Sequence, residues 1–347
     1  RQPRSTLFPY TTLFRSSKDL LFDVYLPLSA GATSNDRAEA TVKKNLGSVA
    51  NKGMELTLDV DIIQKPNFRW NFGVLATHFK NKIISLPPQN RANGIVSGTK
   101  KFMEGHDRYA FWLYQFAGID QMTGKSLFLP DMDRYYIGEA VTGKLQLPSQ
   151  WIVNINDVDY VTNSSYAKKD WSGSAIPDLF GSITTSLTYK NLDLSVLCTY
   201  SLGGKTLDNP YINYMSVSSN PSALHKDLLK SWDGVPAGIT ETSPNRIDPN
   251  GIPVIDYSLN TYNSAASSRF LLDASYFVIK NVSLGYAFPK RLVKKLDISS
   301  ASFKFSIENL ATFTKLRGMD PQQSFTGVSS NGFVTARVFS VGINVNL

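Results

Sequence analysis

The chain of 347 residues contains a single cysteine, Cys198, and it lacks any run of about 18 consecutive apolar residues. A lone cysteine excludes a disulfide within the chain, and it excludes a thiolate-rich metal site. The missing apolar run excludes a transmembrane helix. The net charge is +8, but the lysines and arginines are scattered. Charge therefore does not indicate a nucleic-acid partner.

Sequence signatures of catalysis and metal binding are also missing. No Gly-x-Ser-x-Gly elbow is present, and Gly203-Gly204-Lys205-Thr206 matches only the tail of a phosphate-binding loop. The histidines lie on separate segments without ligand spacing: His78, His106 and His225. Two aspartate pairs resemble the start of a calcium loop but lack its later glycine and glutamate: Asp131 with Asp133, and Asp157 with Asp159. We expect no enzyme activity, no metal and no cofactor, although a looser calcium site in a loop stays open.

The chain does contain repeated alternation of apolar and polar residues. In residues 339–347 every odd-numbered residue is apolar, and every even-numbered residue is Ser, Gly or Asn. Residues 53–62 and 68–77 follow the same pattern, with Leu75 as one exception. Because successive side chains of a strand point to opposite faces, each run predicts a strand with one apolar face. A length of about 10 residues is enough for a tilted strand to cross a bilayer.

The connections between these runs alternate between short and long. Residues 64–67 and 190–191 are short turns, whereas residues 202–269 form a long loop rich in Pro, Asn and Ser. Compact soluble domains seldom keep such loops, but outer-membrane barrels combine short periplasmic turns with long extracellular loops. About nine strands are predicted: residues 19–26, 53–62, 68–77, 109–117, 185–189, 192–200, 276–288, 302–310 and 333–347.

The fold class that we predict is all-β, an antiparallel transmembrane β-barrel with long extracellular loops. The barrel is expected to be partial, because bacterial barrels close with even strand numbers and the large transporters have about 22 strands. One face of the strands is expected to contact lipid through these residues: Leu56, Leu58, Val60, Val74, Leu194, Val196, Ile307, Val341, Ile343 and Val345.

Several short motifs resemble the SusC/RagA-like TonB-dependent transporters of the Bacteroidetes outer membrane. The first is the strand entry Asn45-Leu-Gly-Ser-Val-Ala-Asn51-Lys-Gly53-Met-Glu55. The others follow in the order of that family: Ala117-Gly118-Ile119-Asp120 with Thr123-Gly124, Ala175-Ile176-Pro177-Asp178, Leu284-Gly285-Tyr286-Ala287-Phe288-Pro289, Glu308-Asn309-Leu310, Gly318-Met-Asp320-Pro321 and the terminal Gly342-Ile-Asn-Val. One departure is the terminal Leu347, where the family prefers Phe.

The resemblance implies a location in the cell outer membrane and a role in importing glycans or peptides. It also implies partners: a SusD-like surface lipoprotein, the outer-membrane lipid, and TonB acting through an N-terminal plug region. Residues 17–347 are expected to be the C-terminal part of the receptor barrel. Residues 1–16 are expected to be non-native, because Thr6 to Ser16 looks like the translation of a sequencing adapter.

Ligand capture is expected from aromatic residues of the long loops, since sugar rings pack their C–H faces on aromatic side chains. Six candidates stand among Asn and Asp residues: Tyr135, Tyr136, Trp171, Tyr211, Tyr214 and Trp232. For each ring alone, bracing of a loop is the simpler interpretation. The competing hypothesis for the whole chain is a soluble or secreted carbohydrate-binding β-protein, and it differs in predicting material that stays monodisperse without detergent.

Overall fold

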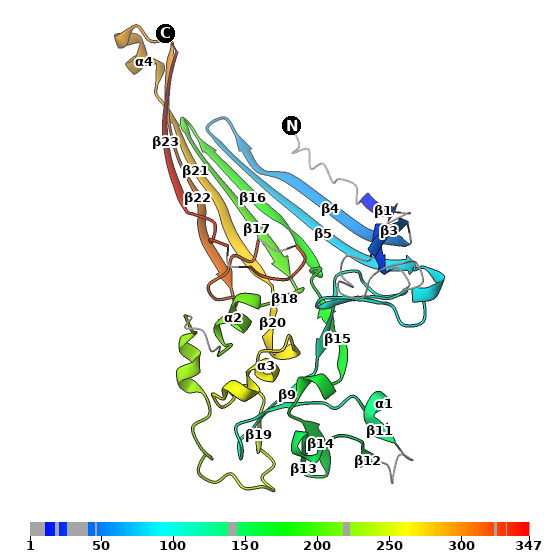
Figure 1. Cartoon of the computed structure of the whole chain (residues 1–347). Coiled ribbons are helices and arrows are strands. Elements are labelled where there is room, and N and C mark those ends of the chain that lie inside the picture. The colour runs from blue at the N-terminus through cyan, green and yellow to red at the C-terminus, as the bar shows by residue number, and fades with distance from the viewer. Residues whose placement is uncertain are drawn as a thin grey trace.

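The computed structural model describes residues 11–17, 21–25, 41–45, 47–137, 144–217, 223–322, 325–330 and 332–346. Its main feature is one eight-stranded sheet, which we call the wall (Figure 1). All neighbouring strands in the wall are antiparallel. In spatial order they are β1 (Thr11–Ser17), β4 (Ser48–Lys65), β5 (Phe68–Ser85), β16 (Leu179–Tyr189), β17 (Leu192–Leu202), β21 (Tyr276–Ala287), β22 (Ser300–Thr314) and β23 (Val338–Asn346).

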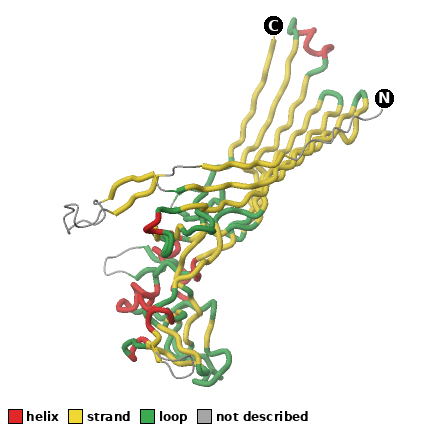
Figure 2. The backbone as a smooth tube through the Cα atoms, turned by 90° about the vertical axis from the view of Figure 1, so that its right-hand side faces the viewer, coloured by secondary structure: helices red, strands yellow, loops and turns green. Residues whose placement is uncertain are grey.

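The two ends of the wall differ in their connections. At the end drawn uppermost in Figure 1, short turns join β4 to β5 and β16 to β17, and α4 (Lys290–Val293) lies between β21 and β22. At the opposite end the strands lead into long loops that fold together, below the wall in Figures 1 and 2. The short turns and the long loop at residues 202–269 agree with the sequence prediction.

Register divides the wall into an apolar face and a polar face. Directly paired residues of antiparallel strands share a face, so a row across the sheet can be followed from pair to pair. One row is mostly apolar: Val60, Phe72, Thr185, Val196, Val282, Ile307 and Phe339. The next row is entirely polar: Asp61, Asn71, Ser186, Ser195, Ser283, Ser306 and Ser340.

The same register places all ten residues predicted to face lipid on the apolar face. Aromatic residues mark both ends of this face. Near the short turns the paired rows contain Phe68, Tyr189, Tyr286 and Phe303, and near the loops they contain Tyr200, Phe277 and Phe313. On β17 these rows are separated by about 27 Å along the strand at ~3.4 Å per residue. At a strand tilt of about 40° this is about 21 Å along the membrane normal, slightly less than the ~25 Å apolar band of outer-membrane barrels.

Seven of the nine predicted strands lie in the wall, and the other two form strands elsewhere. Residues 19–26 contain β2 (Leu21–Tyr25), which pairs only with β3 (Thr41–Asn45), and residues 109–117 contain β8 (Ala110–Tyr114), which belongs to a loop sheet. The last predicted strand also begins later than expected, at Val338. The reason is that Thr335 bonds to the Asp320 carboxylate instead of entering the ladder. Leu347 and residues 1–10 lie outside the described residues.

The loops contain strands and short helices of their own. A five-stranded sheet comprises β13 (Ile152–Ile155), β14 (Val158–Val161), β10 (Ser126–Phe128), β9 (Phe116–Asp120) and β19 (Ile247–Asp248). A four-stranded sheet comprises β15 (Lys169–Ser174), β8, β7 (Lys100–Phe102) and β6 (Ile95–Ser97), and two ribbons pair β11 (Tyr136–Ile137) with β12 (Lys144–Leu145) and β18 (Lys205–Leu207) with β20 (Leu271–Asp273).

The helices are short, and the α-helices besides α4 are α1 (Met132–Tyr135), α2 (Asn209–Tyr214) and α3 (Asn260–Asn263). Segments of 3-10 helix are Pro88–Asn90, Ser149–Trp151, Ser164–Tyr166, Lys226–Lys230, Tyr257–Leu259, Ser268–Phe270 and Lys294–Leu296. Among the described residues, none of the helices has the length and apolar content needed to cross a membrane. A buried core holds the loops together: Phe111, Leu113, Leu207, Ile212 and Phe270.

Candidate functional site

A cavity of about 200 Å³ lies where the polar face of the wall meets the loops. Phe79 on β5, Phe180 on β16 and Tyr276 on β21 line it from polar-face positions, and Phe325 lines it from the loop between β22 and β23. The rings of Phe79 and Phe180 meet edge to face at 6.0 Å. We call this site the junction pocket.

The polar lining of the junction pocket is uncharged. Ser201 and Gln322 contribute to it, and its remaining members are small or apolar: Ala175, Pro177, Gly203, Ala274 and Pro321. Lys280 lies outside the lining and donates from its ammonium group to Gln322 Oε1 at 3.2 Å. The pocket therefore offers aromatic surface and neutral hydrogen-bonding groups.

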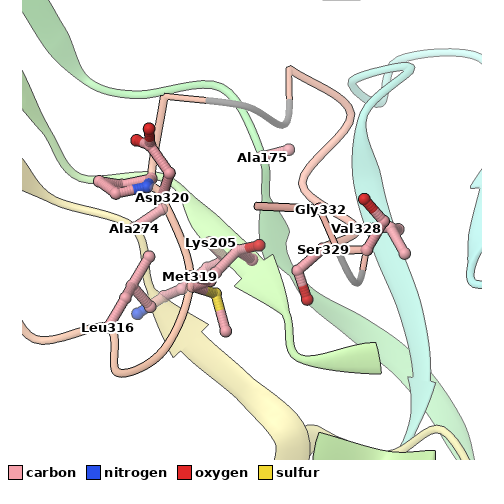
Figure 3. Close-up of a pocket in the computed structure, with 12 residues that line it drawn as sticks. Ala175, Lys205, Ala274, Leu316, Met319, Asp320, Val328, Ser329 and Gly332 are labelled. Atoms are coloured by element: carbon pink, nitrogen blue, oxygen red, sulfur yellow. The ribbon is translucent and has the colours of Figure 1, made fainter. Parts of the chain in front are cut away.

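A second, smaller cavity of about 60 Å³ adjoins the junction pocket and shares Ala175, Ala274 and Pro321 with it. Figure 3 shows Lys205 of β18 and, from the loop between β22 and β23, Asp320 and Ser329 around it. Its size suits ordered water rather than a ligand.

The loop between β22 and β23 is fixed by hydrogen bonds. The Asp320 carboxylate accepts from the backbone N–H and the hydroxyl of Thr335 and from the backbone N–H of Gln322. Burial alone would raise the pKa of Asp320, but these hydrogen bonds outweigh it and hold the pKa below its ordinary value. Leu207 N–H and the Thr206 hydroxyl both donate to the Gly327 carbonyl. Phe325 is thus carried by a loop anchored on both sides.

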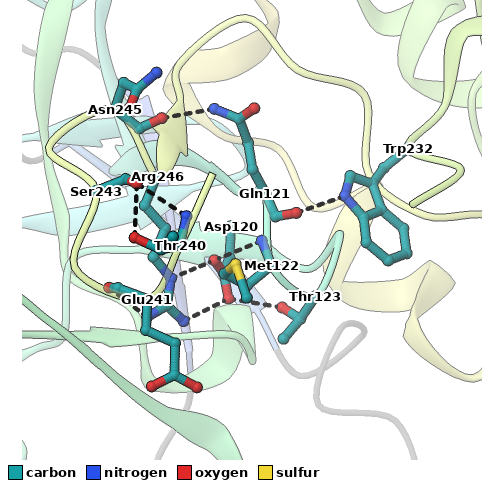
Figure 4. A network of polar contacts seen from close by, with 10 residues as sticks. All are labelled: Asp120, Gln121, Met122, Thr123, Trp232, Thr240, Glu241, Ser243, Asn245 and Arg246. Atoms are coloured by element: carbon teal, nitrogen blue, oxygen red, sulfur yellow. Dashed lines mark hydrogen bonds and ion pairs between the residues drawn. The ribbon is translucent and has the colours of Figure 1, made fainter. Parts of the chain in front are cut away.

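A buried ion pair joins two loops that are far apart in the chain (Figure 4). The Arg246 guanidinium donates to both carboxylate oxygens of Asp120, at 2.7 Å and 3.0 Å. The same carboxylate accepts from the Thr123 hydroxyl at 2.8 Å and from the Met122 backbone N–H at 3.1 Å. Burial raises the pKa of Asp120, yet the hydrogen bonds from Arg246 and Thr123 more than offset it, so the pKa lies below its ordinary value.

Trp232 adds a second connection beside this ion pair. Its indole N–H donates to the Gln121 carbonyl at 2.8 Å, as Figure 4 shows. Its ring packs against Gly124, where a Cβ atom would come within 2.5 Å of the ring and where φ is +70°. The motif at residues 117–124 is therefore a docking point for residues 232–254, and its glycine makes room for the tryptophan.

Partial burial in the loops also shifts the pKa of Lys100, Arg269 and Tyr211. Burial lowers the pKa of Lys100 to about 7 against an opposing effect of Asp107, while its ammonium group donates to the Tyr109 carbonyl and lies 3.1 Å from the Phe111 ring centroid. Burial lowers the pKa of Arg269 to about 10. Burial, together with the neighbouring Asp227, raises the pKa of Tyr211 to about 12.

The six aromatic candidates from the sequence lie in separate places. Tyr135, at the end of α1, meets the ring of Tyr166 edge to face at 5.3 Å, and Tyr136 begins β11. Trp171 on β15 stacks on His106 at 3.9 Å and meets Trp112 at 5.1 Å. Tyr135 and Trp171 thus each contact another aromatic ring within the loops.

The other three candidates also contact neighbouring loops. Tyr211 on α2 donates from its hydroxyl to Asp227 and packs in the loop core. Tyr214, on the same helix, is exposed and accepts the His225 backbone N–H at its carbonyl. Trp232 contacts Gly124 as described above. The structure brings together only Tyr211 and Tyr214, on one helix, and none of the six lines the junction pocket.

The aromatic residues of the junction pocket were missed by the sequence interpretation. They could have been recognised in the sequence as aromatic residues at strand positions where the alternation predicts a polar residue. Phe79 and Phe180 are such residues, because Asn71 and Ser186 occupy the same face of their strands.

One of the two aspartate pairs lies near a turn. Asn156 and Asp157 form the turn between β13 and β14, and both have positive φ. Within the described ranges no three His, Cys, Asp or Glu side chains gather as a metal site.

No family model matches the chain. TonB-dependent receptor P3 of Formosa agariphila is 25% identical to it over 97% of this chain and 32% of its own length. TonB-dependent receptor SusC of Bacteroides thetaiotaomicron is 23% identical over 96% of this chain and 29% of its own length. The chain thus spans about a third of the length of these curated relatives.

Among solved structures, the RagAB peptide transporter matches 97% of this chain and 33% of its own chain, with a TM-score of 0.68 and 21% identity. This likeness shows the fold, and it agrees with the two-faced antiparallel wall. The chain is therefore a homologue of the SusC/RagA-like TonB-dependent receptors, and its sheet is part of the wall of their β-barrel.

Proposed function

We propose that this chain supplies part of the barrel wall and the extracellular loops of an outer-membrane importer of glycans or peptides. The observation that carries the proposal is the wall itself, which has a continuous apolar face and a polar face that ends at a cluster of folded loops. An apolar band suits contact with lipid, and a row of Ser, Asn and Asp suits a hydrated lumen. The relatives are named TonB-dependent receptors, and this also supports the proposed function.

The partners of the importer are proposed from the same relatives. A surface lipoprotein of the SusD type would close over the loops and deliver ligand, and TonB would act through a plug that occupies the lumen. Solved structures that resemble this chain are described as RagAB in open-open and closed-closed states. We propose a similar opening and closing for the importer to which this chain belongs, with the loops at residues 202–269 and 315–337 facing the lipoprotein.

The junction pocket is the proposed contact for one unit of the ligand. A cavity of about 200 Å³ is smaller than the roughly 300 to 1,000 Å³ of pockets that enclose a drug-sized molecule. It therefore suits a single sugar ring or a single large side chain of a longer ligand. Because its described lining has no charged group, the unit would be neutral and would pack on Phe79, Phe180 and Phe325.

The test uses the complete receptor carrying this chain, purified in detergent. Neutral oligosaccharides and neutral peptides are titrated by calorimetry into the wild type and into Phe325→Ala. An aromatic contact of this kind is worth about 0.5 to 1.5 kcal/mol, so the variant should bind about 2- to 13-fold more weakly. Tyr257→Ala is the matched control, because Tyr257 is an exposed loop aromatic outside the pocket.

Each outcome of the titration decides one part of the proposal. Binding of one ligand class, weakened only by Phe325→Ala, supports the pocket and identifies the class. Equal binding by both variants would remove the pocket from the proposal. If the detergent-free chain stayed monodisperse and did not float with vesicles, the barrel function would give way to the soluble carbohydrate-binding alternative.

A further inference from the structure

The segment that joins β21 to β22 is strongly basic. In residues 288–299, which we call the basic turn, four basic residues stand against one acidic residue, Asp297. All four are exposed: Lys290, Arg291, Lys294 and Lys295. None of the ion pairs found in the described ranges involves them. The net charge of the basic turn would stay positive even beside one further carboxylate.

Backbone hydrogen bonds fix the basic turn on the wall. The Phe288 N–H donates to the Ala301 carbonyl at 2.9 Å. Val293 is buried, and its carbonyl accepts from the Ile298 N–H at 3.2 Å. Figure 1 shows α4, within this turn, at the tip of the wall where the short turns lie. Because the short turns of outer-membrane barrels face the periplasm, we expect the basic turn on the periplasmic side.

The basic turn continues the apolar face of the wall. Tyr286 belongs to the aromatic row near the short turns, and its ring meets that of Phe288 edge to face at 5.4 Å. Phe288 and Leu292 are 39% and 54% exposed. Lys290 follows Tyr286 by at most about 14 Å at ~3.4 Å per residue, or about 10 Å along the membrane normal at a tilt of about 40°. The headgroup layer is about 5 to 8 Å thick, so the lysine side chain is within reach of it.

A hollow of about 530 Å³ lies between the basic turn and the turn that joins β16 to β17. It spans the end of the sheet, since Asp193 in its lining is on the polar face and Ala301 is on the apolar face. Lys190 lines it from one turn and Lys290 from the other. Asp193 is the one acidic residue of the described lining, and its carboxylate accepts from the Thr188 hydroxyl at 2.7 Å. The hydroxyl groups in the lining are those of Ser299 and Ser300.

We propose that this hollow binds the headgroup of an anionic phospholipid of the inner leaflet, with the phosphodiester between Lys190 and Lys290. Continuity with the apolar face favours a lipid over a free anion, because acyl chains that leave the hollow would meet Phe288 and then Tyr286, which is 37% exposed. The other three basic residues of the turn would attract the surrounding anionic headgroups. Lysine stems can lie along apolar surface while their ammonium groups reach the phosphate.

This site rests on the proposed outer-membrane function, so the test separates lipid binding from membrane insertion. The complete receptor in detergent is titrated with dioleoylphosphatidylglycerol, and bound lipid is counted by native mass spectrometry. The wild type should bind it in preference to dioleoylphosphatidylcholine, which has the same acyl chains and no net charge. A basic residue near an anionic lipid surface contributes about fivefold in affinity. Lys190→Gln with Lys290→Gln should therefore bind phosphatidylglycerol roughly 25-fold more weakly.

Two double variants control for position and for charge. Lys226→Gln with Lys230→Gln removes two exposed lysines from a 3-10 segment of the long loop, at the opposite end of the wall, and it should leave phosphatidylglycerol binding unchanged. Lys190→Arg with Lys290→Arg keeps both charges and should retain binding. Flotation of every variant with phosphatidylcholine vesicles reports insertion alone, and it should be equal for all.

The outcomes bear on the proposal in different ways. Loss of phosphatidylglycerol binding in the Lys190 and Lys290 glutamine variant alone, with equal flotation, supports it. Equal binding by the wild type and this variant would overturn it, and so would an equal loss in the Lys226 and Lys230 control. Displacement of the lipid by glycerol 3-phosphate at similar concentration would also overturn it, because the hollow would then be a general anion site. Failure of the wild type to float would instead refute the proposed function.

Discussion

The buried ion pair between Asp120 and Arg246 gives the sharpest prediction. The Asp120 side chain is fully buried and that of Arg246 is 11% exposed. Arg246→Met would leave the carboxylate buried with only the Thr123 hydroxyl and the Met122 N–H as donors. Removing one partner of a buried ion pair costs about 3 to 5 kcal/mol. The loops at residues 117–124 and 232–254 should therefore separate far more often.

Native-state hydrogen exchange measures this separation directly. Two backbone N–H groups report on it: that of Gln121, which bonds to the Arg246 carbonyl, and that of Val254, which bonds to the Gly124 carbonyl. A loss of about 3 kcal/mol corresponds to exchange that is roughly 100-fold faster. The wall amides between β16 and β17 should be unaffected, because the ion pair lies outside the wall.

Arg69→Met is the matched control for Arg246→Met. Arg69 also pairs with an aspartate, Asp61, but the two side chains are 57% and 27% exposed. Exposed pairs contribute about 0 to 1 kcal/mol, so exchange should change less than about fivefold. If both variants accelerated exchange equally, the assignment of Arg246 as the link between the loops would be refuted.

The pH dependence of the same amides follows from the lowered pKa of Asp120. A carboxylate with a pKa below its unfolded value contributes stability that is fully present above the unfolded value. The contribution is lost as the pH falls through the folded pKa, which lies below 3.8. Protection should therefore persist at pH 5 and decline only in stronger acid, whereas Arg246→Met should lack this decline.

Three further predictions concern the wall and the partly buried Lys100. Val196→Lys on the apolar face should lower the free energy of unfolding of the barrel by about 2 to 4 kcal/mol, measured by urea titration in lipid vesicles. Ser195→Lys on the polar face should lower it by less than about 1 kcal/mol. Equal effects of the two variants would contradict the face assignment. Gly181→Val should lower the folded yield, because a Cβ atom there would lie within 1.9 Å of the Leu75 carbonyl oxygen; a normal yield would show that the strands can separate at this point. The pKa of Lys100 falls from 10.5 to about 7 on folding. Between these two pH values the unfolded state binds more protons than the folded state, so the folded state gains stability as the pH rises. Protection of the loop amides from hydrogen exchange should therefore increase from pH 7 to pH 10.5. In Lys100→Met this rise should be absent in hydrogen exchange corrected for intrinsic rates, and an unchanged rise would assign it to another group.

The wall could be predicted from the sequence because its strands need an apolar side chain at every second residue. A strand between lipid and a hydrated lumen must alternate, so Leu194 and Val196 reveal their face from local sequence alone. Strand pairing then follows from short turns such as residues 190–191. Two predicted strands failed to join the wall because alternation specifies a strand but does not specify which sheet it enters.

The loops were less predictable because their contacts span long distances in sequence. Asp120 belongs to a motif that the sequence made visible, yet its partner Arg246 lies 126 residues away. Nothing near Arg246 marks it as a buried cation. The aromatic candidates Trp171 and Trp232 were recognised as rings in loops, but their contacts with His106 and Gly124 depend on folds that local patterns do not encode.

The two parts of the molecule therefore differ in how they respond to substitution. Each wall position shares its role with many equivalent positions, so the costly substitutions should be a charge on the apolar face or a side chain at a tightly packed glycine such as Gly53, Gly73 or Gly181. The loops depend on a few polar contacts, of which the buried pair of Asp120 with Arg246 and the exposed contact of Asp320 with Thr335 are two. Phe325 lies between Asp320 and Thr335 in the chain and lines the junction pocket. If the junction pocket contacts ligand as proposed, a substitution at Phe325 should change ligand preference without breaking either of these contacts.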